Sequence, residues 1–221
     1  DSQSTEIHDI ENTINRIIRE NDLQESFIYI QVTRGVQSPR NHVYQADIQP
    51  TVLIMHENYN IYPRDKIMQG FSATIQNDFR WTKANIKSIS LLGNVLLKNY
   101  AHDNDCYESL LIRDDLVTEG AASNIFIVEN GNVLTPKLSD KLLPGVTRDL
   151  IISLGEQNNR KVYEEDISTE RLLNAEEIWC SSSTNYVVPI TKVDDVLIQG
   201  GKVGNITGVF YNLVSDYINT L

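Results

Sequence analysis

Apolar and polar residues recur along the chain with two different spacings, which predict both helices and strands. Near the start, over residues 6–18, isoleucines recur at intervals of three or four and so line one face of a helix. These residues are Ile7, Ile10, Ile14, Ile17 and Ile18. Because such an apolar stripe needs a surface to cover it, we expect this helix to pack against a partner.

Short runs of β-branched and aromatic residues predict strands, several of them joined as hairpins. The predicted strands cover residues 27–32, 51–55, 71–75, 107–112, 124–128, 133–134, 177–180, 189–193 and 196–198. Asn130-Gly131 lies between two of these runs, and this dipeptide is the strongest short signal for a tight hairpin turn. Further helices are predicted over residues 85–99, 143–157, 168–175 and 206–217. Because hairpins outnumber regular strand–helix–strand units, the predicted class is α+β.

The predicted helix over residues 85–99 has so little charge that we expect it to be buried in the heart of the molecule. Lys87 is the only charged residue between Ile86 and Leu97. Removal of a lysine from water disfavours its ammonium form and leaves a nucleophilic amine, which makes Lys87 a candidate catalytic residue. A lysine that reaches from the helix surface into solvent would explain the same residue without any chemistry.

Composition and charge narrow the classes of function. The 221 residues suit one large domain or two modest ones, and the net charge of −11 disfavours binding to nucleic acid or to an anionic membrane. Cys106 and Cys180 cannot form a disulfide framework, so we expect a cytoplasmic protein, and no apolar run is long enough to span a membrane. The sequence has no P-loop, no HExxH and no Cys/His spacing that suits a metal, so we expect no metal site.

Three further segments contain groups that could hold an anionic cofactor. Glu119 is a single carboxylate before a run of small residues, although a plain loop explains that composition as well. The segment 145–147 begins a predicted helix after Pro144, where free N–H groups suit a phosphate unless they serve only as a helix start. Residues 181–184 add four hydroxyls at the end of a predicted strand, or form a polar turn. Together with the amine of Lys87, these groups are what pyridoxal phosphate requires.

The same segments, in the same order, resemble those of the D-amino-acid aminotransferases of fold type IV. The matching segments are residues 29–35 with 38–42, 85–94, 117–124, 143–148 and 201–204. The resemblance covers essentially the whole chain. It implies the remainder of a small α/β domain over residues 1–80, followed over residues 86–221 by a larger cofactor-binding domain with a mixed, barrel-like sheet and helices.

The resemblance also implies roles for individual residues. Lys87 would form the Schiff base with pyridoxal 5'-phosphate, and Glu119 would pair with the pyridine nitrogen. The other positions that match cofactor contacts are Leu143, Val146, Thr147, Ser182 and Ser183. The positions that match the site for the substrate carboxylate are Tyr29, Arg40 and His42. A guanidinium suits that purpose because it can donate two parallel hydrogen bonds to a carboxylate.

Two departures from the family pattern affect the expectation. Ala121 and Ala122 stand where the family has serines, and roughly the first 55–60 residues of the pattern have no counterpart in this chain. We therefore expect a homodimeric D-alanine:2-oxoglutarate aminotransferase that yields pyruvate and D-glutamate. The alternatives are a branched-chain aminotransferase, an aminodeoxychorismate lyase of the same fold, or a truncated relic without activity.

Overall fold

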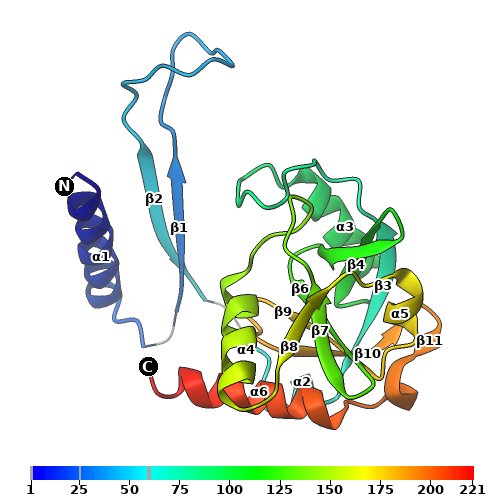
Figure 1. Ribbon diagram of the computed structural model, residues 1–221. Coiled ribbons are helices and arrows are strands. Elements are labelled where there is room, and N and C mark those ends of the chain that lie inside the picture. Colours follow the sequence, from blue (N-terminus) through cyan, green and yellow to red (C-terminus); the bar gives the residue numbers. More distant parts are fainter. Residues whose placement is uncertain (1, 25, 59–60) are drawn as a thin grey trace. The chain divides into compact units, whose positions relative to one another are not determined.

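The chain folds into two compact units, Asp1–Asn60 and Ile61–Leu221 (Figure 1). The computed structural model describes the backbone of residues 2–24, 26–58 and 61–221, and in the first helix it describes side chains from Asp9 onward. Strand β3 (Phe71–Asn77), which we expected in the first domain, lies within the sheet of the second unit. That the first unit is the remainder of the family's small domain stays a prediction.

The first unit consists of a helix and a pair of strands, as predicted. Helix α1 (Ser2–Glu20) contacts β2 (Thr51–Glu57), which pairs antiparallel with β1 (Phe27–Thr33). The α1 isoleucines at positions 10, 14 and 17 are half-buried, and the side chain of Ile7 lies outside the described residues. The predicted stripe therefore finds part of its covering surface within its own unit.

The second unit contains a mixed sheet, which in residues 61–221 has nine strands in the order β5-β4-β3-β10-β9-β6-β7-β8, with β11 beside β10. The strands after β3 are β4 (Glu108–Arg113), β5 (Leu116–Gly120), β6 (Asn124–Glu129), β7 (Asn132–Pro136), β8 (Val162–Glu165), β9 (Glu177–Ser181), β10 (Val188–Val193) and β11 (Val196–Leu197). Strand β3 runs parallel to β4 and β10, β7 runs parallel to β8, and the other pairs are antiparallel. Because β5 also contacts β6 and β7, the sheet curls over instead of lying flat.

The β6–β7 hairpin confirms the turn predicted from Asn130-Gly131. Both residues have positive φ, 52° and 73° respectively, as a tight hairpin turn of this kind requires. Strand β8 was not predicted, because its four residues include two glutamates and lack a clear alternating pattern. Its pairing with β7 supplies the context that the local sequence lacks.

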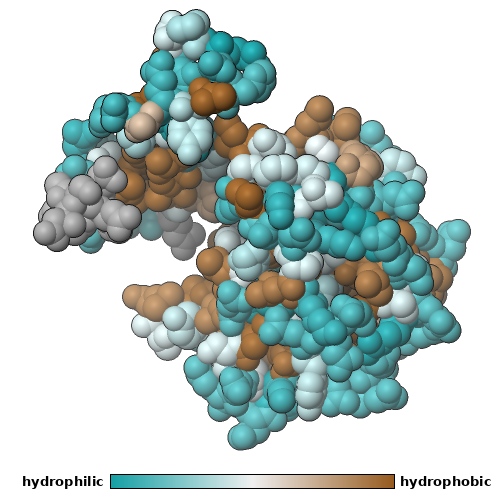
Figure 2. Space-filling view, turned by 45° about the horizontal axis from the view of Figure 1, so that its top comes forward, coloured by the Kyte–Doolittle hydropathy of each residue, from teal (hydrophilic) through white to brown (hydrophobic). Residues whose placement is uncertain are grey.

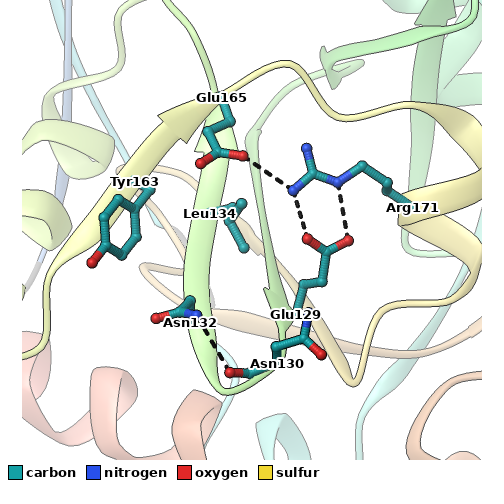
Figure 3. Close-up of a pocket in the computed structure, with 7 residues that line it drawn as sticks. All are labelled: Glu129, Asn130, Asn132, Leu134, Tyr163, Glu165 and Arg171. Atoms are coloured by element: carbon teal, nitrogen blue, oxygen red, sulfur yellow. Dashed lines mark hydrogen bonds and ion pairs between the residues drawn. The ribbon is translucent and has the colours of Figure 1, made fainter.

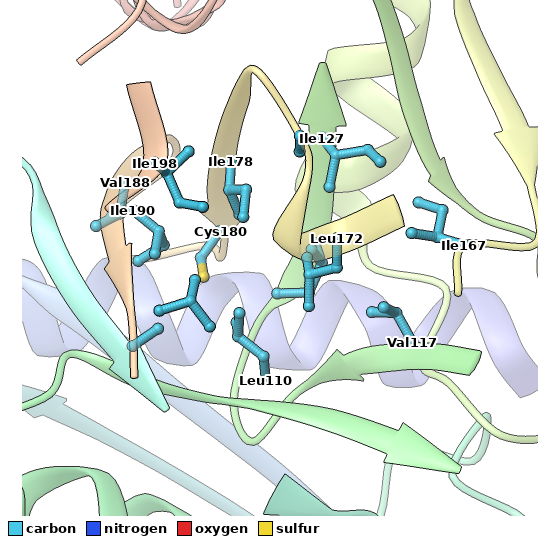
Figure 4. Close-up of a cluster of buried hydrophobic side chains, with 14 of the residues drawn as sticks. Leu110, Val117, Ile127, Ile167, Leu172, Ile178, Cys180, Val188, Ile190 and Ile198 are labelled. Carbon is cyan, nitrogen blue, oxygen red and sulfur yellow. The ribbon is translucent and has the colours of Figure 1, made fainter. Parts of the chain in front are cut away.

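Two clusters of buried side chains lie on opposite faces of the curled sheet, and the alternation along β6 separates them. Ile125 and Ile127 belong to one cluster, which Figure 4 shows between strands on several sides, whereas Phe126 and Val128 belong to the other. The second cluster lies beneath α4 (Val146–Gln157) and α6 (Asn205–Ile218), which pack against each other (Figure 1). The remaining short helices are α2 (Arg64–Ile67), α5 (Thr169–Leu173) and the 3-10 turn η1 (Ile198–Gly201).

The prediction of a buried helix over residues 85–99 is wrong in two respects. Helix α3 spans Leu92–Asp103, and along its length Leu97 and Ala101 are buried while most of its other apolar side chains are exposed. The exposed apolar side chains of residues 86–100 are those of Ile86, Ile89, Leu91, Leu92, Val95, Leu96 and Tyr100. The physical reason is that α3 covers one small cluster, formed by Leu97, Leu111 and Ala121, so the rest of its apolar surface faces outward in the single chain. None of the described helices is both long and apolar enough to cross a membrane.

Candidate active site

Glu119 is a buried carboxylate whose position is set by groups from three parts of the second unit. It lies next to the last residue of β5, and only 5% of its surface is exposed. Its Oε1 accepts a hydrogen bond from Nη1 of Arg80 at 2.6 Å, and its Oε2 accepts from the backbone N–H of Leu143 at 2.9 Å. The side-chain amide of Asn124 donates to the same Oε2 at 3.4 Å. These contacts hold both carboxylate oxygens in a defined orientation.

The environment of Glu119 brings its protonation close to neutral pH. Burial raises the pKa of this carboxyl from 4.5 to about 7, although the guanidinium of Arg80 and the Leu143 amide act in the opposite direction. A carboxyl with a pKa near 7 can both hold and release a proton under physiological conditions. Glu119 can therefore share a proton with a basic nitrogen placed against it.

Arg80 and Asp78 belong to this site, although sequence reasoning did not find them. The carboxylate of Asp78 accepts from Nε of Arg80 at 2.8 Å and from Nη2 at 3.0 Å. Burial alone would raise the pKa of Asp78, but the hydrogen bonds and charge of Arg80 outweigh it and lower this pKa. A signal was present, because two opposite charges spaced two residues apart directly after an apolar strand point to the same side of the chain. Glu119 is consequently not the lone acid that the sequence indicated.

A second group of polar atoms lies beside Glu119, at the start of α4. The helix begins after Gly145, no side chain of the described residues caps its first turn, and Thr147 in that turn is buried. A Cβ at Gly145 would collide with the side chain of Asn124, which also donates to the carbonyl oxygen of Leu143 at 2.8 Å. Asn124 thus joins the carboxylate of Glu119 to the start of α4. Uncapped N–H groups and the positive end of the helix dipole suit a phosphate there.

The run of hydroxyls at residues 181–184 is attached to the same place. Ser181 pairs with Asn124 across β9 and β6, and its buried Oγ has no hydrogen-bond partner among the described residues. The Oγ of Ser182 already accepts from the backbone of Asn185 at 3.2 Å and lies 3.1 Å from Oγ1 of Thr184, and Ser183 is exposed. Of the four hydroxyls, that of Ser181 is therefore the buried one left free for a ligand.

Lys87 lies on the loop between Arg80 and α3, and it is exposed in the single chain. Its neighbour Ile86 is 51% exposed, so the hypothesis that nearby apolar residues of this chain shield Lys87 from water is wrong. The loop is nevertheless anchored near Glu119 at both ends. It starts from Arg80, and a Cβ at Gly93, in the first turn of α3, would lie 3.0 Å from Cγ of Arg80.

The candidate substrate residues lie in the first unit. The structure brings Arg40 and His42 together, with 3.5 Å between Nη2 of the arginine and Nε2 of the histidine, and both side chains are exposed. Tyr29 is half-buried on β1, where its hydroxyl donates to Oε1 of Gln31 at 2.8 Å. Their contact with a substrate carboxylate stays a prediction.

Ala121 and Ala122, which replace serines of the family pattern, have different surroundings. Ala121 is buried in the cluster with Leu97 and Leu111, whereas Ala122 is exposed and its N–H donates to Oε2 of Glu108 at 3.3 Å. A methyl group at position 121 suits an apolar cluster, which gives this substitution a local physical reason.

A surface pocket of about 250 Å³ opens elsewhere on the second unit, beside the β6–β7 hairpin (Figure 3). Arg171 lines it and already donates to Glu129 at 2.6 and 3.0 Å and to Glu165 at 3.1 Å. Because Glu129 and Asn124 are at opposite ends of β6, this pocket is about 17 Å along the strand from the Glu119 site. Its charged groups are already paired with one another, so we assign the chemistry to the Glu119 site instead.

Comparison with known proteins agrees with this assignment. Residues 2–193 match the family model for amino-transferase class IV. The class IV aminotransferases are therefore the family to which this chain belongs. It is 38% identical to a D-alanine aminotransferase of Listeria innocua over 93% of this chain and 71% of that protein.

Solved structures confirm the fold. The branched-chain amino acid aminotransferase of Escherichia coli superposes with a TM-score of 0.82 at 24% identity, covering 96% of this chain and 71% of that one. A bacterial branched-chain amino acid aminotransferase (source abbreviated T.th.) that was solved with pyridoxamine 5'-phosphate gives a TM-score of 0.85 at 18% identity with the same coverage. Both the family and the fold type IV expected from the sequence are thus confirmed, and the cofactor of such enzymes is pyridoxal phosphate.

The residues of this chain fit that cofactor. Ser181 has an unpartnered buried hydroxyl and α4 has an uncapped first turn, which together offer donors to a phosphate. On the other side of Asn124, Glu119 offers a buried acceptor to a protonated ring nitrogen. Val146 is the first residue of α4; its side chain is 75% exposed, so its fit rests on the backbone N–H.

Proposed function

We propose that this class IV aminotransferase acts on D-amino acids, with D-alanine and 2-oxoglutarate as substrates and pyruvate and D-glutamate as products. The observation that carries the site is the placement of the buried Glu119 carboxylate, through Asn124, against the uncapped start of α4. The identity of 38% to a protein named D-alanine aminotransferase supports the choice of substrate class. The likeness to branched-chain enzymes rests on the fold alone and does not favour them as a second candidate.

In this proposal the residues of the chain divide the work between holding the cofactor and moving a proton. Bound pyridoxal phosphate supplies an aldehyde to which an amine can attach and a ring that takes up electrons from the substrate Cα. Glu119 holds a proton on the ring nitrogen, and the start of α4 with Ser181 binds the phosphate, helped by Ser182 and Ser183. Lys87 attaches to the cofactor and then carries a proton between the substrate Cα and C4′. Leu143 packs against the ring.

We also propose a homodimer in which a second copy covers the apolar surface around α3. Leu92 is 73% exposed and Ile89 is 65% exposed, and Figure 2 shows hydrophobic side chains at the surface of this unit. Contiguous apolar surface of this kind marks an interaction site in a folded protein. A covering partner would also remove water from the surroundings of Lys87, which the single chain does not do.

A borohydride experiment tests the assignment of Lys87. The full chain is loaded with pyridoxal phosphate and reduced with borohydride, and the labelled lysine is then identified by peptide mass spectrometry. We expect the label on Lys87 and its loss in Lys87→Ala. Lys83→Ala is the matched control, because Lys83 is an exposed lysine of the same loop whose Nζ lies 3.5 Å from Asp140, and it should leave labelling unchanged. A label on another lysine would contradict the assignment.

A substrate panel tests the reaction. We expect D-alanine to yield pyruvate when 2-oxoglutarate is present, and L-leucine to give no turnover. Turnover of L-leucine instead would point to a branched-chain aminotransferase, and release of pyruvate from aminodeoxychorismate would point to the lyase. A protein that binds no cofactor and converts none of these compounds would be a relic.

A further inference from the structure

Four charged side chains form a continuous row through the interior beside the candidate site. In order they are Arg113, Asp78, Arg80 and Glu119, and the exposed fractions of their side chains are 14%, 0%, 5% and 6%. Nitrogen–oxygen distances along the row are 3.0 Å, 2.8 Å and 2.6 Å. Two positive and two negative charges alternate, so the row is formally neutral while Glu119 is ionised.

Asp78 occupies most of the hydrogen-bonding capacity of Arg80. It accepts from Nε and Nη2, so Nη1 is the nitrogen that donates to Glu119, and Nη2 also reaches the carbonyl oxygen of Lys141 at 3.3 Å. Asp78 itself is held by Thr118, whose hydroxyl donates to Oδ2 at 2.9 Å. The guanidinium is therefore divided between two carboxylates and is not dedicated to Glu119.

We infer that Asp78 is a positioning residue which, by taking up much of the charge of Arg80, leaves Glu119 free to gain and lose a proton within the site. An Arg80 that faced Glu119 alone would keep this carboxylate permanently ionised. The consequence for the ring nitrogen rests on the proposed function, because it requires that the cofactor ring face Glu119. The inference about charge concerns the protein alone.

The other groups around Glu119 do not carry a competing charge. From β6 it meets the neutral amide of Asn124, and from the loop before α4 it meets the backbone N–H of Leu143. The ammonium of Lys141 on that loop is bonded to Asp114 at 2.9 Å. Among the described residues, Asp78, Arg80 and Arg113 are thus the charges that decide the protonation of Glu119.

The test follows the titration of Glu119 in the cofactor-free full chain by carbon NMR of labelled glutamate carboxyls, with Glu119→Gln used to assign the signal. Asp78→Asn retains an oxygen that can accept from Arg80 but removes the negative charge. We expect the midpoint of the Glu119 titration to fall by about one pH unit, a tenfold loss of proton affinity. Arg113→Gln removes a positive charge from the other side of Asp78, and we expect a shift upward.

Opposite directions in the two variants are a result that simple loss of structure cannot produce. Asp194→Asn is the control, since Asp194 accepts from the hydroxyl of Thr74 at 2.7 Å and touches neither Arg80 nor Glu119, and it should leave the midpoint unchanged. If Asp78→Asn does not fold, the upward shift in Arg113→Gln still tests the idea. A midpoint that is unchanged or higher in Asp78→Asn, or unchanged or lower in Arg113→Gln, would overturn it. Because these measurements need no cofactor, their failure is separate from a failure to label Lys87.

Discussion

Replacement of Glu119 by glutamine should remove a distinct pH dependence of stability. The pKa of this carboxyl is about 7 in the folded chain, against an ordinary value of 4.5, so the folded state binds the proton more tightly than the unfolded state. As pH rises from about 4.5 to about 7, the unfolded state loses its proton first, and the free energy of unfolding decreases. Below this window both states are protonated, and above it both are ionised, so the contribution is constant there.

The size of the effect follows from the difference between the two pKa values. Each unit corresponds to about 1.4 kcal/mol, which bounds the whole contribution near 3 kcal/mol. Between pH 5 and pH 8 the expected decrease is about 2 kcal/mol. Because the carboxylate is 5% exposed, screening by solvent reduces this figure little.

Urea unfolding of the cofactor-free chain at pH 5 and pH 8 measures this contribution as a difference between the wild type and Glu119→Gln. Titration of other groups is common to both proteins and largely cancels, and the lowered pKa of Asp78 keeps that group ionised throughout the window. Glu156→Gln, an exposed position on α4, is the control and should give no difference. If the wild type is as stable or more stable at pH 8 relative to the variant, burial does not dominate at Glu119 and the reasoning is refuted.

Two further predictions concern packing and assembly. Gly204→Ala should destabilise the chain by about 2 kcal/mol or more, because a Cβ there would collide with the buried carboxyl of Glu177, whereas Gly208→Ala, with open space around it on the same helix α6, should stabilise it by up to about 1 kcal/mol; thermal unfolding measures both, and similar effects at the two positions would contradict the packing argument. Leu92→Arg should shift the protein from dimer to monomer in sedimentation at micromolar concentration, whereas Gln157→Arg, exposed on α4, should not; a wild-type chain that sediments as a monomer would refute the proposed dimer.

Local patterns in the sequence were sufficient for most elements and for the family. The period of two along β6 and the Asn130-Gly131 turn depend on neighbours in the chain, so the β6–β7 hairpin was predicted correctly. Ser168 caps α5 as expected, because its side chain accepts from the N–H of Arg171 three residues on. The segments around Lys87, Glu119 and the start of α4 likewise indicated a class IV aminotransferase through their residues and order alone.

The environment of each site residue was decided by contacts between distant segments. Arg80 and Glu119 are 39 residues apart, and no local spacing predicts that their side chains meet at 2.6 Å and share a buried position with Asp78. The apolar composition around Lys87 predicted burial, yet composition specifies only that a surface prefers to leave water, not which surface covers it. The sequence by itself thus determined the elements, the family and the candidate residues, because these depend on short-range periodicity and on motifs. The tertiary structure alone decided which charges are paired, which hydroxyl is left free and which apolar face stays exposed, because these depend on how separate strands and loops converge.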